Sequence, residues 1–122
     1  MTNNYLAASS MLGQILYSGQ PASTGENTVY TVPTNTTIKI ASASLCNTST
    51  SSAVTVSVSI VPSGGTADTT HRIISGFSIN TNDTVSLKEY VEGVMMGPGD
   101  FISINVGTAS LVDIVITGTV VS

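Results

Sequence analysis

The only histidine of the chain, His71, lies close to an aspartate and a serine, a grouping that can carry acyl-transfer chemistry. Asp68, His71 and Ser75 could act in principle as orienting acid, general base and nucleophile. That chemistry also needs a turn that holds the nucleophile and an oxyanion hole, and the sequence contains no nucleophile-elbow motif. Asp68 and His71 stand in a Gly/Thr-rich stretch, where aspartate is common as a turn former. We therefore predict that the chain is not an enzyme.

Candidate metal ligands are few and irregularly spaced. A zinc site needs about three or four His, Cys or carboxylate ligands, and the chain has one histidine, His71, and one cysteine, Cys46. Copies of His71 could still meet at a three-fold axis and hold an ion in an oligomer. The carboxylates that could bind calcium follow no EF-hand or other regular spacing: Asp83, Glu89, Glu92, Asp100 and Asp113. No phosphate-loop motif is present either, so we predict no metal and no cofactor.

Aromatic residues offer few candidates for a recognition surface. The chain has no tryptophan, two phenylalanines and four tyrosines, so an aromatic platform for sugar binding is only weakly indicated. Each tyrosine joins an apolar body to a polar tip and could either anchor an oligomer interface or pack as ordinary core: Tyr5, Tyr17, Tyr30 and Tyr90.

Short β-strands must position all of these residues, because apolar side chains recur at every second position along most of the chain. The clearest case is 53–61, where valine and isoleucine alternate with serine and threonine. Gly76 indicates a bulge, 88–96 has room for one helical turn, and Gly97-Pro98-Gly99-Asp100 predicts a type II turn. Similar strands are expected at 28–32, 37–46, 72–79, 84–87, 101–106 and 111–121, while 11–17 is either a strand or an arm on a neighbour. The pattern predicts an all-β fold, an antiparallel β-sandwich or jelly roll of about 7–8 short strands.

The first 27 residues differ from the rest, and we divide the chain into an N-terminal arm and loop (1–27) and a β-sandwich domain (28–122). The arm begins with small polar residues, continues through a short apolar run and ends in a loop with Gly19, Pro21 and Gly25. We expect it to contact a neighbouring subunit through Tyr5, Leu6, Met11, Leu12, Ile15 and Tyr17.

The composition favours a covered surface over a freely diffusing monomer. Charged residues make up 8% of the chain, against about 25% in an average soluble protein, while serine and threonine occur 18 times each. A free monomer usually relies on charge for solubility, so we favour assembly with partners over a monomer with a hydroxyl-rich coat. The basic residues Lys39, Arg72 and Lys88 are scattered, so we expect no binding to nucleic acid or membrane. Cys46 is expected to be a small buried residue, and residues 1–10 lack the features of a signal peptide.

Several turn and strand segments resemble a group of small structural proteins of tailed bacteriophages. The segments are Leu12-Gly13-Gln14, 29–33 (VYTVP), 45–48 (LCNT), 79–85 and 99–102, and together they cover roughly residues 12–118. In that group a strand of the form LYTVP precedes a β-branched strand and a CN turn. The resemblance implies a virion component: a head decoration protein, a collar or neck element, or part of a tail or fibre.

From the composition and the resemblance together we predict a phage virion structural protein. The first hypothesis is a capsid decoration (cement) protein that binds the head shell as a homo-oligomer, with a trimer favoured because it matches local three-fold positions. Its partners would be the phage major capsid protein or other virion proteins, and its location the virion. The alternative is a tail, neck or fibre component involved in host attachment, which would be expected to expose more aromatic or ionic loops than this chain has.

Overall fold

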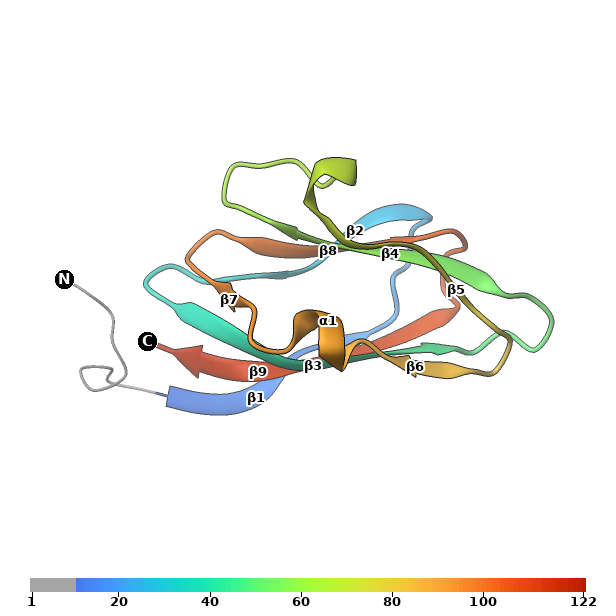
Figure 1. Ribbon diagram of the computed structural model, residues 1–122, viewed down its shortest axis with the longest axis horizontal. Coiled ribbons are helices and arrows are strands. Elements are labelled where there is room, and N and C mark those ends of the chain that lie inside the picture. The colour runs from blue at the N-terminus through green and yellow to red at the C-terminus, as the bar shows by residue number, and fades with distance from the viewer. Residues whose placement is uncertain (1–10) are drawn as a thin grey trace.

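The computed structural model describes residues 11–122, which form two antiparallel sheets packed face to face (Figure 1). The strands are β1 (Met11–Gly19), β2 (Gly25–Thr31), β3 (Thr37–Asn47), β4 (Val54–Val61), β5 (Arg72–Ile79), β6 (Thr84–Ser86), β7 (Met95–Met96), β8 (Phe101–Val106) and β9 (Val112–Val121). One 3-10 turn, η1 (Thr69–His71), precedes β5, and one short helix, α1 (Lys88–Val91), follows β6. The predicted all-β sandwich is confirmed.

The order of the strands within the two sheets is that of a jelly roll. The β1 sheet has the order β1-β9-β3-β6, with β7 also paired to β3, and the β2 sheet has the order β2-β8-β4-β5. The hydrogen-bonded pairs therefore include β1 with β9, β2 with β8, β3 with β6 and β4 with β5. Apart from the two-residue β7, the chain is a long hairpin rolled over on itself, which is the jelly-roll connection.

The sandwich begins earlier in the sequence than the boundary expected between residues 27 and 28. Met11–Gly19 is a strand that pairs along its length with β9, and β2 starts at Gly25. Pairing with β9 satisfies the backbone groups on one side of the apolar run at 11–17, so this segment is a strand of the sandwich and not an arm. The part of the expected arm before Met11 lies outside the described residues.

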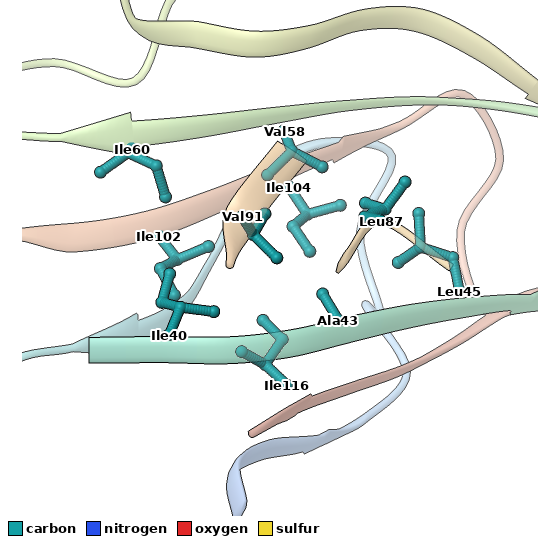
Figure 2. A pocket seen from close by; sticks show the side chains of 10 residues that line it. All are labelled: Ile40, Ala43, Leu45, Val58, Ile60, Leu87, Val91, Ile102, Ile104 and Ile116. Atoms are coloured by element: carbon teal, nitrogen blue, oxygen red, sulfur yellow. The ribbon is translucent and has the colours of Figure 1, made fainter. Parts of the chain in front are cut away.

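The core is an aliphatic layer to which both sheets contribute alternate side chains. Ile38 and Ile40 from β3 and Ile114 from β9 face Val56 from β4 and Ile104 from β8, and each of these side chains is at most 1% exposed. The alternation expected for 53–61 places Val54, Val56 and Val58 in this layer. Figure 2 shows side chains from the two sheets pointing toward each other across it.

Two bulges beside β9 change which residues face the core. Ala41 is an extra residue in β3 opposite the Gly118–Thr117 step of β9, and Leu16 is an extra residue in β1 opposite the next step. A Cβ on Gly118 would lie 2.6 Å from the Lys39 carbonyl oxygen and 2.9 Å from Leu16 Cδ1, so the close approach here requires glycine.

The bulge at Ala41 also explains why Cys46 is half-buried and not fully buried as expected. Even-numbered residues of β3 face the core before the bulge, and odd-numbered residues such as Ala43 and Leu45 face it afterwards. Cys46 therefore lies on the outer face, opposite Asp113 of β9.

Three local predictions are confirmed. Gly76 has φ +66° and sits where the pairing of β4 with β5 shifts register, as a bulge requires. Gly99 has φ +84° and the Asp100 amide donates to the Gly97 carbonyl at 3.1 Å, which defines the type II turn. The helical turn within 88–96 is α1.

Replacing Val56 by aspartate should lower the free energy of unfolding by at least about 3 kcal/mol, because it buries an unpaired charge. The matched control is Thr55→Asp, since Thr55 is the exposed neighbour on the opposite face of β4, and it should cost less than about 1 kcal/mol. Urea unfolding of both variants measures the difference. Equal midpoints for the two variants would contradict the strand register.

Candidate functional site

The three residues considered for catalysis lie in and just after the turn before β5, and Asp68 has a structural role there. Asp68 caps η1: its carboxylate accepts hydrogen bonds from the Thr70 backbone amide, at 2.9 Å, and from the Thr70 hydroxyl. These two bonds hold the pKa of the Asp68 carboxyl below its ordinary value. His71 is half-buried, Ser75 is exposed on β5, and no hydrogen bond within residues 11–122 joins the His71 ring to Ser75.

The carboxylates considered for calcium are dispersed over the described residues, where three of them accept hydrogen bonds and Glu92 pairs with Lys88 on α1 at 3.5 Å. Asp100 accepts from the Ser63 amide at 2.9 Å and from the Gly97 amide at 2.8 Å, which fixes the loop before β8. Asp113 accepts from Gln20 Nε2 at 2.9 Å, and Asp83 accepts from the Thr84 amide at 2.9 Å. Within residues 11–122 no three His, Cys, Asp or Glu side chains gather as metal ligands would.

The space between the sheets is too small for a ligand. Its cavity measures about 10 Å³ and is bounded by aliphatic side chains of both sheets and α1 (Figure 2). A volume of this size accommodates about one water molecule, and an apolar lining offers that water no hydrogen-bond partners. A ligand or partner therefore has access only to the outer surfaces of the described sandwich.

The outer face of the β2 sheet carries a polar network that the sequence analysis missed. Glu26 of β2 accepts hydrogen bonds from Arg72 Nη2 at 2.7 Å, from Ser103 Oγ at 2.7 Å and from Asn105 Nδ2 at 3.0 Å. Arg72 of β5 also donates to Ser59 of β4. The network therefore links all four strands of this sheet. Each partner of Glu26 is at least 46 residues away from it in the sequence, so no local sequence pattern indicates the network.

The network also sets the charge state of Glu26. Partial burial alone would raise the pKa of its carboxyl, but the hydrogen bonds from Arg72, Asn105 and Ser103, with the positive charge of Arg72, bring it below its ordinary value. The side chains of Arg72 and Glu26 are 14% and 29% exposed. This face of the sandwich thus carries a partly buried ion pair whose two members are also hydrogen-bonded to side chains of β4 and β8.

The β1 sheet differs from the β2 sheet because it carries most of the exposed hydrophobic side chains. Seven large hydrophobic side chains are exposed among residues 11–122, and five of them belong to the β1 sheet. Met11, Leu12 and Ile15 of β1 are 54%, 58% and 60% exposed. We call these three residues the β1 edge surface; the other two are Met95 of β7 and Val115 of β9.

Beside the β1 edge surface, the outer face of the β1 sheet is mostly small and hydroxyl-bearing. Ile15 is paired with Thr117, which is paired with Ser42, and the hydroxyl oxygens of Thr117 and Ser42 lie 2.6 Å apart. The next row of this face pairs Ser18 with Val115 and Val115 with Ser44. Among the described strands of this sheet, charged side chains occur only at Lys39 and Asp113. This largely uncharged surface, with its exposed aliphatic side chains, is the candidate interface.

The residues expected at an interface are thus partly brought together. Met11, Leu12 and Ile15 share one edge strand and are exposed, whereas Tyr17 of the same strand packs against the core. Tyr5 and Leu6 lie outside the described residues. Of the other tyrosines, Tyr30 packs against the core, where burial raises its pKa, and Tyr90 is exposed on α1.

No helix within residues 11–122 has the length and apolar character needed to cross a membrane.

The chain is similar to known proteins in structure, but no match is found by sequence. No protein-family model matches the chain, and no curated protein matches it. Solved structures that match include the T13 viral particle of infectious bursal disease virus, with a TM-score of 0.49 and 9% identity over 93% of this chain and 31% of that chain. The Gx strain of the same virus gives a TM-score of 0.47 and 10% identity over 92% of this chain and 32% of that chain. This chain spans about a third of the length of those viral chains.

The Glu26 network predicts a specific loss of stability in acid. Because the folded-state pKa of Glu26 is lowered, its contribution is present above the unfolded-state pKa and is lost as pH falls through the folded-state pKa. At pH 7 the free energy of unfolding of Glu26→Gln should be about 1–2 kcal/mol lower than that of the wild type. This difference in stability should disappear in strong acid, where Glu26 is protonated.

Urea unfolding at neutral pH and in strong acid measures that difference. The control is Glu89→Gln on α1, an exposed position, which should change stability by less than about 0.5 kcal/mol at pH 7. A difference for Glu26→Gln that stays constant across the pH range would contradict the role assigned to the network.

Proposed function

We propose that the chain is a structural subunit of a virion, and within that class a capsid decoration (cement) protein that binds the head shell as a homo-oligomer. The observation that carries the proposal is the concentration of exposed hydrophobic side chains on the β1 sheet, at Met11, Leu12, Ile15, Met95 and Val115. The sequence resemblance to small structural proteins of tailed bacteriophages, over roughly residues 12–118, supports the same role.

A neutral, hydroxyl-rich sheet face suits a protein that covers a shell. Contacts built from serine, threonine and isolated aliphatic groups are individually weak, because each removes little apolar area from water. Repetition over many identical sites, together with several copies per oligomer, makes the total strong through effective concentration. The chain has a low charge content of 8%, which reduces repulsion between closely spaced copies.

The copy number per particle tests this role and separates it from the alternative. Quantitative mass spectrometry of purified virions from the source of the chain should give copies in the hundreds for a decoration protein. Copies in small multiples of six or twelve would instead favour a neck or tail subunit, and a few copies a fibre component. Absence of the chain from purified particles would contradict the virion role itself.

Deleting residues 1–10 should weaken assembly and leave the sandwich folded. These residues precede β1 and include Tyr5 and Leu6, which we expect at a subunit interface, whereas the described core is built from residue 16 onward. Size-exclusion chromatography and binding to particles that lack the chain measure assembly, and circular dichroism with a melting curve measures the fold. Unchanged assembly with an unchanged fold would show that the arm has no role in the interface.

A further inference from the structure

The four edges of the described sandwich are not protected equally against pairing with another strand. An edge strand presents unpaired backbone N–H and C=O groups, and natural proteins protect it with charges, proline, bulges or short length. At the far edge of the β1 sheet, β6 and β7 have three and two residues. In the β2 sheet, β2 carries Glu26 and β5 carries Arg72 and the bulge at Gly76.

The edge strand β1 lacks most of these protections. It has nine residues, none charged and none proline, and the β1 edge surface is exposed along it. Its bulge at Leu16 interrupts the regular pairing with β9 and leaves Met11–Ile15 as an uninterrupted stretch. A stretch of this kind accepts another extended strand through backbone hydrogen bonds.

We infer that β1 pairs antiparallel with β1 of a second copy of this chain, about a two-fold axis at Gly13. In this register Gly13 lies opposite the partner's Gly13, and Met11 lies opposite the partner's Ile15. Leu12 then lies opposite the partner's Gln14. The pairing uses the whole regular stretch and ends before the bulge, and it joins the β1 sheets of the two copies into one continuous sheet.

Gly13 lies at the proposed two-fold axis, between the exposed side chains of Met11 and Ile15. Its φ is not positive, and a Cβ built on it would meet no atom within 4 Å of the same chain. Side chains of a strand point out of the plane of the sheet, so a residue at position 13 does not obstruct backbone pairing with a second strand. With glycine there, no side chain separates the two apolar pairs that flank the axis.

The side chains around Gly13 are self-complementary. Met11 and Ile15 are 54% and 60% exposed and lie on the same face of β1, two residues to either side of Gly13. Antiparallel pairing about Gly13 places each of them against the other in the partner, and cross-strand apolar pairs stabilise a sheet. No charge of β1 lies near the axis, so the net charge of -4 on each copy does not bring like charges together there.

This inference does not depend on the proposed virion role, and it differs from the trimer expected from the sequence. An isologous contact of one strand with itself has two-fold symmetry and gives a dimer. A trimer in solution would therefore overturn the pairing and leave the virion role standing.

Disulfide crosslinking of the full-length chain tests the register. Gly13→Cys in a Cys46→Ser background should form an intermolecular disulfide on mild oxidation, because directly opposed residues have Cα atoms roughly 4.5–5.5 Å apart, within the disulfide range. The control is Ser78→Cys in the same background, since Ser78 is exposed on β5, and it should remain monomeric on a non-reducing gel. Equal crosslinking of the two variants, or none at Gly13→Cys, would overturn the proposal.

Light scattering of size-separated samples over a concentration series tests the surface independently. The wild type should show a concentration-dependent dimer, and Ile15→Lys should weaken its formation by at least about tenfold while circular dichroism stays unchanged. The control Phe77→Lys removes an exposed apolar side chain, 38% exposed, from β5 and should dimerise like the wild type. A monomer at every concentration, a trimer, or wild-type dimerisation by Ile15→Lys would contradict the pairing.

Discussion

The structure depends on filling one apolar layer from two sheets at once. Each strand can bury only every second side chain, so the side chains of Ile38, Val56 and Ile104 enter the layer while their neighbours along the strand are left on an outer face. The cavity between the sheets measures about 10 Å³, which is too small for a ligand. Contacts with a partner are therefore made at the surface of the described sandwich.

The outward-facing side chains differ between the two sheets. On the β2 sheet, Glu26 and Arg72 bridge strands at 2.7 Å and satisfy the hydroxyls of Ser59 and Ser103. The β1 sheet has no such network among its described residues, and apart from Lys39 and Asp113 its exposed groups are mostly hydroxyls and aliphatic side chains. This asymmetry is the physical basis for our proposal that the β1 sheet serves assembly, while the network on the β2 sheet contributes to stability.

Local sequence patterns predicted most strands and turns. The features they did not predict depend on pairing between residues far apart in the sequence. The alternation at 53–61 and the Gly97–Asp100 turn depend on neighbouring residues only, so they could be predicted. The bulges at Leu16 and Ala41 arise from how β1 and β3 fit beside Gly118, and the second of them moved Cys46 to the outer face. Glu26 and Arg72 meet across 46 positions, which no local pattern indicates. Met11, Leu12 and Ile15 were expected at an interface because an uncharged apolar run is visible in sequence, and that role stays a prediction. The run itself fits either a strand or an arm, and the pairing of β1 with β9 that makes it a strand is a long-range contact.

Hydrogen–deuterium exchange of the β1 backbone tests most directly whether this edge is where copies associate. Amides at an unpaired edge exchange quickly, and pairing with another strand slows them. Comparing dilute and concentrated samples of the full-length chain, we expect exchange at 11–15 to slow with concentration while the β5 edge stays unchanged. Exchange at 11–15 that is the same at every concentration would contradict the account.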